Sequence, residues 1–308
     1  MNGDVAMQAA ISTQGLTRTF GRLDAVRQLD LQVPEGSVFA LIGPNGAGKT
    51  TTIKLLMNLL HPTSGQATVL GTDSRRLGVR ELQRIGYVSE NQQLPDWLSP
   101  AELLAYCRPL YPTWDDGLVR RLQDALGLSS RAPLKSLSRG TRMKAALLAS
   151  LAYRPELVVL DEPFSGLDPL VRDELVRALL EAPGERPVTV FVSSHDVDEV
   201  ERLADWVGFL RDGRLIFAEP VECLLSRFRL VEVVLPDDRP VTGALHAEWM
   251  QQGTSGRTLR FIDPQYTAAG AHDRIAAAFP GATVATTPLA LRDIFVSLAR
   301  NRSQAEAL

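Results

Sequence analysis

The sequence predicts an α/β fold built on a mostly parallel sheet, and two observations lead to this prediction. Three short and mainly apolar runs, at 38–42, 157–160 and 188–192, have the composition of strands that are buried on both faces. Helical patterns lie between these runs, as crossovers between parallel strands require. Active sites in such sheets lie beyond the carboxyl ends of the strands, so the residues that follow each run are candidates for chemistry.

The composition is that of a globular chain without a basic excess. Of the 308 residues, 45% are hydrophobic and 22% are charged, which argues against disorder and allows a large core. The net charge of −3 leaves no surplus of Lys and Arg for nucleic-acid phosphates, so no nucleic acid is expected as a partner. Cys107 and Cys223 lie outside any cysteine or histidine cluster, which indicates neither a disulfide framework nor a metal centre.

Neither a membrane span nor a signal peptide is expected. No apolar run reaches the ~20 residues that a bilayer-spanning helix needs. The first residues lack the basic and apolar regions of a secretory signal. We therefore expect a cytoplasmic protein that another protein holds at the membrane if it works there.

The helices are predicted from apolar spacing and from their end signals. Thr50 to Leu60 carries apolar residues at helical spacing directly after a glycine loop. The stretch 93–155 is predicted to be mostly helical, with Ser99 as the N-cap of one helix and Gly127 at the end of another. Within it, helices are expected to begin at Pro100, Leu118 and Arg139, and a further helix is expected from Pro169 to Leu180.

The pattern changes after about residue 222, which predicts a second, smaller domain. Strands are expected at 231–235 and 258–262, and helices at 271–279 and 289–300. The last helix has an apolar stripe that suits packing on a small sheet. We expect one domain at 1–222 and a small α+β appendix at 223–308.

The loop after the first buried strand suits phosphate binding. It fits GxxxxGK[ST] at every position, with a strand before it and a helix after it. Glycines let backbone N–H groups turn inward around an anion, and the helix directs its positive end at that anion. The alternative is a glycine-rich turn without chemical meaning. The expected nucleotide contacts are Gly43, Pro44, Asn45, Gly46, Ala47, Gly48, Lys49, Thr50 and Thr51, with Lys49 on the β/γ-phosphates and the Thr50 hydroxyl on Mg²⁺.

Two carboxylates follow the second buried strand. Asp161 comes directly after Leu160, and an oxygen ligand at this place suits Mg²⁺. Glu162 lies one residue further and can project toward the terminal phosphate, where a carboxylate can polarise an attacking water. An acidic turn after a core strand is the alternative, and a phosphate-binding loop in the same chain argues against it.

Further motifs resemble those of ABC ATPases. The segment 137–141, Leu-Ser-Arg-Gly-Thr, resembles the LSGGQ signature of that family, and 165–168 resembles its D-loop. Ser193-Ser194-His195 closes a strand as the family's switch histidine does, and Phe20 stands where the adenine-stacking aromatic belongs. The motifs occur in family order over residues 11 to about 218. The sequence is therefore identified as a member of the ABC ATPases.

The resemblance implies a fold and a mechanism. It implies a P-loop NTPase with a RecA-like core, an antiparallel β subdomain and an inserted helical subdomain at about 93–155. It also implies an ATPase that uses ATP and Mg²⁺, with Glu162 and His195 as catalytic residues and Phe20 at the adenine. In the implied head-to-tail dimer, each ATP lies between one subunit's phosphate loop and the other's signature. Ser138, Gly140 and Asp168 are then expected to contact nucleotide across that interface.

Three positions depart from the family's pattern, and in the signature they include Thr141 in place of Gln. The other two carry specific expectations. Glu90 stands where the family usually has a Gln, and we expect it to serve Mg²⁺ or the attacking water. The alternative is a solvated loop acid, with Gln92 or Gln93 as the substitute. Arg139 replaces a small Gly in the signature. It is expected either to be solvated or to contact phosphate or the partner subunit.

The single cassette resembles bacterial exporter ATPases of the ABC-2 type. Three segments carry this finer resemblance, at 111–115, 171–175 and 288–295. It implies export through a separate integral-membrane permease, which docks near residues 90–115 and keeps the chain at the cytoplasmic face of the cell membrane. A second cassette, another copy or a paralogue, completes the dimer. The alternative is a soluble ABC-family ATPase that acts on ribosomes or DNA.

Overall fold

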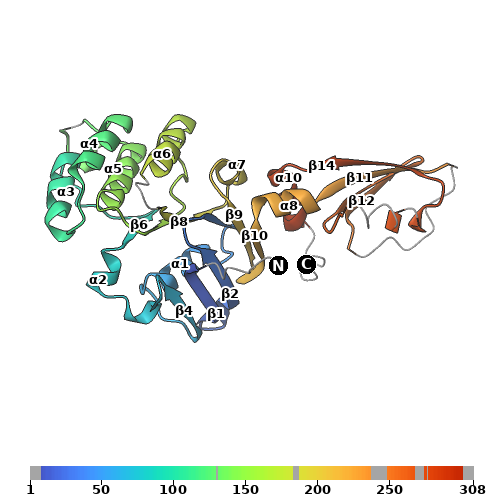
Figure 1. Ribbon diagram of the computed structural model, residues 1–308, viewed down its shortest axis with the longest axis horizontal. Helices are drawn as coiled ribbons and strands as arrows, with labels where there is room; N and C mark the ends of the chain where they lie inside the picture. Colours follow the sequence, from blue (N-terminus) through green and yellow to red (C-terminus); the bar gives the residue numbers. More distant parts are fainter. Residues whose placement is uncertain are drawn as a thin grey trace, which may run out of the picture. The chain divides into compact units, whose positions relative to one another are not determined.

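A six-stranded sheet in the order β10-β9-β3-β8-β7-β6 is the centre of the first part of the chain (Figure 1). The pairs β3·β8, β3·β9, β7·β8 and β6·β7 are parallel, as predicted. The apolar runs at 38–42, 157–160 and 188–192 fall in β3, β7 and β8, which are almost completely buried. Its strands are β3 (Val38–Ile42), β6 (Ile85–Ser89), β7 (Leu157–Asp161), β8 (Thr189–Ser194), β9 (Trp206–Arg211) and β10 (Arg214–Pro220).

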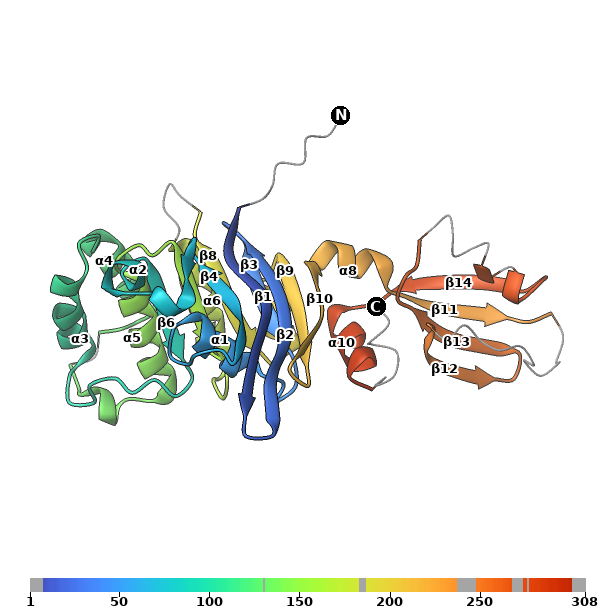
Figure 2. The ribbon, with the colours of Figure 1, turned by 90° about the horizontal axis from the view of Figure 1, so that it is seen from below.

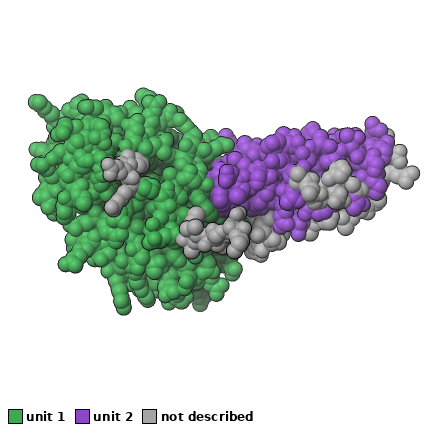
Figure 3. Space-filling view, viewed as in Figure 1, with its two compact units in different colours: residues 1–218 green, residues 219–308 purple. Residues whose placement is uncertain are grey.

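The computed structural model describes residues 8–129, 131–182, 187–236, 248–267, 274–275 and 277–300. The chain divides into two compact units, 1–218 and 219–308 (Figure 3). The boundary predicted from the sequence lies four residues later, between 222 and 223. In the structure the second unit already includes α8 (Val221–Arg227).

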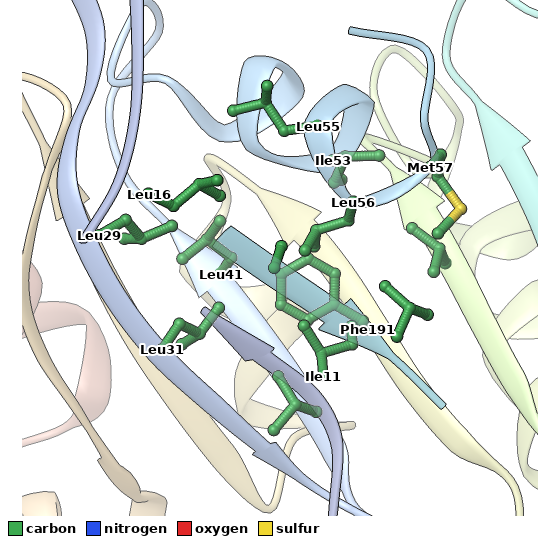
Figure 4. Packing of buried hydrophobic residues seen from close by; sticks show 14 of the residues in the cluster. Ile11, Leu16, Leu29, Leu31, Leu41, Ile53, Leu55, Leu56, Met57 and Phe191 are labelled. Atoms are coloured by element: carbon green, nitrogen blue, oxygen red, sulfur yellow. The ribbon is translucent and has the colours of Figure 1, made fainter. Parts of the chain in front are cut away.

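An antiparallel sheet in the order β2-β1-β4-β5 faces the central sheet within the first unit. Figure 2 shows its two long strands side by side, β1 (Ala9–Phe20) and β2 (Leu23–Pro34); the others are β4 (Ser64–Val69) and β5 (Thr72–Asp73). Helix α1 (Lys49–Leu56) contributes to the core that both sheets share, which holds the phosphate loop against a rigid support. The labelled side chains of this core are Ile11, Leu16, Leu29, Leu31, Leu41, Ile53, Leu55, Leu56, Met57 and Phe191 (Figure 4).

Helix α1 is shorter than the sequence suggests. It ends at Leu56 rather than at Leu60, because Asn58 adopts the left-handed conformation (φ 57°) that commonly ends helices.

The stretch 93–155 forms a helical layer of α3 (Pro100–Cys107), α4 (Asp116–Ala125) and α5 (Arg139–Leu151) (Figure 1). Ser99 caps α3 as predicted, and its hydroxyl and the Glu102 carboxylate form a reciprocal capping box. Helix α4 begins two residues before the predicted Leu118, because the Asp115 carboxylate accepts a hydrogen bond from the Leu118 backbone and so fixes the earlier start.

The segment 111–115, which resembles exporter sequences, connects two helices of this layer. The Thr113 hydroxyl donates to the Tyr153 carbonyl at 2.5 Å. The Asp115 carboxylate pairs with the Arg154 guanidinium at 2.7 Å. Both contacts join the start of α4 to the end of α5.

The chain then continues through α6 (Pro169–Glu181) and α7 (Val197–Glu201), each capped by an aspartate. A short helix, α2 (Val79–Leu82), precedes β6. In the residues from 8 to 300 that the structure describes, no helix is long and apolar enough to span a membrane.

The second unit is a small α+β structure with a core of its own. Its sheet runs in the order β12-β13-β11-β14, and Trp249 stacks on Phe261 at 3.9 Å between ring centroids. The predicted strands match β11 and β13, whereas the predicted helix at 271–279 falls mostly outside the described residues. The other strands were not predicted because they are edge strands with few apolar residues. The elements are β11 (Arg229–Val234), β12 (Met250–Ser255), β13 (Thr258–Asp263), β14 (Thr283–Pro288) and α10 (Leu291–Arg300).

Candidate functional site

The phosphate loop joins β3 to the N-terminus of α1. Gly48 adopts φ 108°, and a Cβ atom there would lie 2.3 Å from the Ala25 carbonyl oxygen of β2. A Cβ at Gly43 would lie 2.1 Å from the Leu210 carbonyl oxygen. Only glycine fits at these two positions. The loop is therefore packed tightly against β2 and β9 where it enters α1, and the N-terminus of a helix attracts anions.

The Lys49 ammonium lies inside this loop and is almost completely buried. Its Nζ donates to the Gly43 carbonyl at 2.7 Å and to the Pro44 carbonyl at 3.3 Å. It also forms an ion pair with Glu162 Oε1 at 3.1 Å. A buried cation that is held at the centre of an anion-binding loop is well placed to receive phosphate oxygens.

The Thr50 hydroxyl and Asp161 form a pair of hard oxygen donors. Thr50 Oγ1 donates to Asp161 Oδ1 at 3.0 Å, so the first residues of α1 meet the end of β7. Burial raises the pKa of Asp161, and the Glu162 charge adds to this effect, although hydrogen bonds from Ser193 and Thr50 oppose it. A divalent cation would relieve the cost of the buried charge. These donors fit Mg²⁺, which takes one or two carboxylates and completes its shell with substrate phosphates and water.

Ser193 supports both acidic residues, and the sequence analysis did not assign it this role. Its hydroxyl donates to Asp161 Oδ1 at 2.8 Å and accepts a hydrogen bond from the Glu162 backbone N–H at 3.0 Å. The parallel register of β7 and β8 places Asp161 opposite Ser193. The signal in the sequence that could have identified Ser193 is a hydroxyl side chain at the end of the predicted strand that follows β7.

Glu162 and His195 form the second pair at this edge of the sheet. Glu162 Oε2 lies 2.7 Å from His195 Nδ1, and the carboxylate is buried while the imidazole is partly exposed. Glu162 has φ 50°, a left-handed conformation that costs a non-glycine residue about 1–2 kcal/mol. Such strained residues concentrate at functional sites, where the surrounding structure holds them.

A cavity of about 690 Å³ brings most of these groups together. Phe20 lines this cavity and is 43% exposed, and the Arg18 guanidinium lies 4.5 Å from the centroid of its ring. Several lining residues were missed because they come from the start of β2 and from the β9–β10 turn, whose sequences carry no phosphate-binding pattern. The cavity is lined by Phe20, Leu23, Asp24, Ala25, Arg27, Asn45, Gly46, Ala47, Gly48, Lys49, Thr50, Thr51, Glu90, Glu162, Ser165, His195, Asp212 and Gly213.

Ser138, Gly140 and Asp168, which were expected at the nucleotide, do not line this cavity. The Ser138 hydroxyl caps α5 by accepting from the Thr141 backbone at 3.1 Å. Asp168 caps α6 by accepting from the Val171 backbone at 3.0 Å. Gly140 packs so closely on Val171 that a Cβ there would lie 3.1 Å from that side chain. Within one chain, these three residues have structural roles.

Glu90 does line the cavity, and it contacts Arg139, which also departs from the family pattern. Its backbone N–H donates to the Asp161 carbonyl at 2.8 Å, and its carboxylate pairs with Arg139 at 2.9 Å. Burial raises the pKa of Glu90, but hydrogen bonds from Arg139 and Ser165 outweigh it, so the pKa lies below its usual value. Gln92 and Gln93, the alternatives for this role, line a neighbouring groove and not the cavity.

That groove has a volume of about 900 Å³ and lies between the segment 89–97 and the first half of α5. Trp97 lines it and is 70% exposed, which is unusual for so large an apolar side chain. Leu94 and Met143 add apolar surface, and Lys135 and Arg142 add positive charge.

Comparisons with known proteins agree with this geometry. The model of the ABC transporter family matches residues 26–165. The bacitracin transport ATP-binding protein of Bacillus licheniformis is 32% identical over 225 residues, which are 72% of this chain and 74% of that protein. The lantibiotic transport ATP-binding protein of Streptococcus pyogenes is 34% identical over 207 residues, which are 67% of this chain and 89% of that protein.

Solved structures show the same fold. The structure of an ATP-binding subunit of an ABC transporter is similar with a TM-score of 0.63 at 25% identity, and the match covers 70% of this chain and 91% of that one. An ATP-binding cassette solved as a dimer in a post-hydrolysis state, bound to ADP and Pi, is similar with a TM-score of 0.61 at 21% identity. That match covers 68% of this chain and 98% of the cassette.

Proposed function

The chain belongs to the ATP-binding proteins of ABC transporters, and from this premise we propose that it hydrolyses ATP with Mg²⁺ to drive export through a separate integral-membrane permease. The observation that carries the proposal is the cavity lined by the phosphate loop and by the Glu162–His195 pair, with Asp161 hydrogen-bonded to Thr50 at its wall. The relatives named for bacitracin and lantibiotic transport support a peptide antibiotic as the cargo class. They do not favour a soluble ribosome- or DNA-associated factor.

We assign the predicted site residues to parts of the nucleotide. Phe20 stacks on the adenine, and the loop 43–51 binds the phosphates with its N–H groups and Lys49. Thr50 and Asp161 hold Mg²⁺, which neutralises phosphate charge when it is bound. Glu162 orients and polarises the attacking water, and His195 fixes the Glu162 carboxylate through the 2.7 Å contact.

Wild-type protein is expected to release phosphate from ATP only when a divalent cation is present. Chelation with EDTA should reduce turnover to background, because Asp161 and Thr50 cannot neutralise the phosphates themselves. Steady-state phosphate release measures this effect, and excess Mg²⁺ added after EDTA should restore the rate. Turnover that persists in EDTA would contradict the metal assignment, and failure to bind ATP at all would contradict the function.

A second cassette completes the site in this proposal. Ser138, Gly140 and Asp168 lie outside the cavity of their own chain, so their expected nucleotide contacts need another copy or a paralogue. The N-terminus of α5, with Ser138 as its cap, offers N–H groups and a positive dipole end to the γ-phosphate of that copy. The dimer described for a cassette of the same fold supports this arrangement.

We place the permease in the groove of about 900 Å³ beside the nucleotide cavity. The lining residues at 90–97 fall inside the range 90–115 that we predicted for docking. It presents an exposed Trp, and such aromatic side chains often anchor protein interfaces. Bound there, the chain works at the cytoplasmic face of the membrane. The second unit, at 219–308, is proposed to stabilise the fold or to help the chain dimerise. The sequence predicted that this unit begins at 223.

A photo-crosslinking amino acid in place of Trp97 is expected to attach the chain to an integral-membrane protein in cells. The same amino acid in place of the exposed Arg120 of α4 is the control, because Arg120 does not line the groove. The product is identified by mass spectrometry after membrane extraction. Crosslinks from position 97 to ribosomal proteins instead would contradict the permease proposal and support the soluble alternative.

A further inference from the structure

Glu90 is the residue that the nucleotide cavity and the neighbouring groove share. Its backbone is fixed to the end of β7 through the Asp161 carbonyl, so the position of its carboxylate depends on what its side chain contacts. That contact is Arg139, the first residue of α5, whose Nη2 lies 2.9 Å from Glu90 Oε1. Two of the three positions at which the chain departs from its family's pattern are therefore bonded to each other.

Both the charge at the start of α5 and the packing of a neighbouring loop favour this position of the Arg139 side chain. A cation in the first turn of a helix is opposed by the helix dipole, and a carboxylate beside it compensates. The guanidinium also lies against the loop that follows Glu162, since a Cβ atom at Gly166 would be 3.1 Å from Arg139 Nη1. One arginine thus connects α5, the loop after β6 and the loop before α6.

We propose that Arg139 is a positioning residue, which holds the Glu90 carboxylate at the wall between the two cavities and so links the signature helix to the nucleotide site of the same chain. This inference rests on the proposed function, because it assigns Arg139 a role in handling MgATP. Both side chains are partly exposed, at 43% and 33%, and ion pairs of this kind add little to folding stability. We therefore expect the loss of the Arg139–Glu90 ion pair to change the binding and hydrolysis of MgATP and not the stability of the fold.

The charges predict how the loss acts. Without Arg139, the Glu90 carboxylate keeps its negative charge beside the place of the terminal phosphates, and like charges repel. When Glu90 is itself replaced by Gln, no charge is left for Arg139 to hold. The cost of removing Arg139 is therefore conditional on Glu90, which neither a solvated Arg139 nor one that contacts phosphate directly would show.

A double-mutant cycle with Arg139→Gln, Glu90→Gln and the double variant tests this conditional cost. We expect Arg139→Gln alone to lower kcat/KM for MgATP about tenfold, and less than about twofold in the Glu90→Gln background. The melting temperatures of all four proteins should agree within about 2 °C, because the pair is surface-exposed. Arg120→Gln, which removes an exposed arginine of the helical layer, should behave as wild type.

Two results would overturn the proposal. Arg139→Gln with wild-type kcat/KM would show that Arg139 positions nothing, and an equal loss in both backgrounds would show that it acts independently of Glu90. The dissociation constant of MgATP is measured for the same four proteins, by displacement of a fluorescent ATP analogue. A wild-type protein that binds MgATP without turnover would thus contradict the hydrolysis proposal and leave the Arg139 test in force.

Discussion

The Glu162→Gln variant is expected to bind MgATP and to hydrolyse it about 10²- to 10⁴-fold more slowly than wild type. Gln has almost the same shape as Glu, but its amide cannot polarise water or accept a proton. The Lys49 ammonium keeps its contacts with the Gly43 and Pro44 carbonyls, so the phosphate loop should remain formed. The loss should therefore appear in kcat, with little change in the affinity for MgATP.

Single-turnover and steady-state phosphate release with saturating MgATP measure this effect. Glu201→Gln is a matched control, because Glu201 is an exposed acid on α7 and does not line the nucleotide cavity. A Glu162→Gln variant that keeps more than about a tenth of the wild-type kcat would show that another group activates the water, because a positioned base contributes at least about 10²-fold.

Replacement of Lys49 by Ala is expected to weaken MgATP binding by about a hundredfold or more, equivalent to at least about 2.7 kcal/mol. The ammonium is buried at the centre of the loop, where its interaction with phosphate oxygens is much less screened than in water. The change also removes the 3.1 Å ion pair between Lys49 and Glu162, and the 2.7 Å contact between Glu162 and His195 remains. We therefore expect a loss of about 1–3 kcal/mol in unfolding free energy as well.

Equilibrium binding of MgATP and thermal unfolding check both parts of this prediction. Lys54→Ala serves as the control, because Lys54 is an exposed lysine of the same helix, α1. A normal affinity in Lys49→Ala would mean that the backbone N–H groups alone bind the phosphates. An unchanged melting temperature would mean that the buried carboxylate of Glu162 needs no cation when the nucleotide is absent.

The sequence was sufficient for the features that local pattern determines. Buried parallel strands need continuous apolar runs, and a phosphate loop needs glycines at fixed positions, so both are written in consecutive residues. Capping boxes are equally local, which is why the start of α3 at Ser99 was predictable. Asp115 shows the limit of this approach. It caps α4 so that the helix starts at Asp116, two residues before the start that the apolar pattern predicted.

Contacts between distant segments could not be read in this way. The support of Asp161 by Ser193 depends on the register of two parallel strands, and the ion pair between Glu90 and Arg139 depends on how α5 packs beside the loop after β6. The cavity wall formed by the β9–β10 turn, including Asp212, has the same origin. In each case the residue type was visible in the sequence, but its partner was set by tertiary structure.

In the proposed mechanism, ATP joins two copies of the phosphate loop and signature into a complete site. Sedimentation velocity of Glu162→Gln, alone, with MgATP and with MgADP, tests it most directly. We predict a dimer in MgATP and a monomer in the other two conditions, because in the proposed dimer the uncleaved γ-phosphate contacts Lys49 of one chain and the Ser138 end of α5 of the other. A variant that binds MgATP and still sediments as a monomer would contradict the claim.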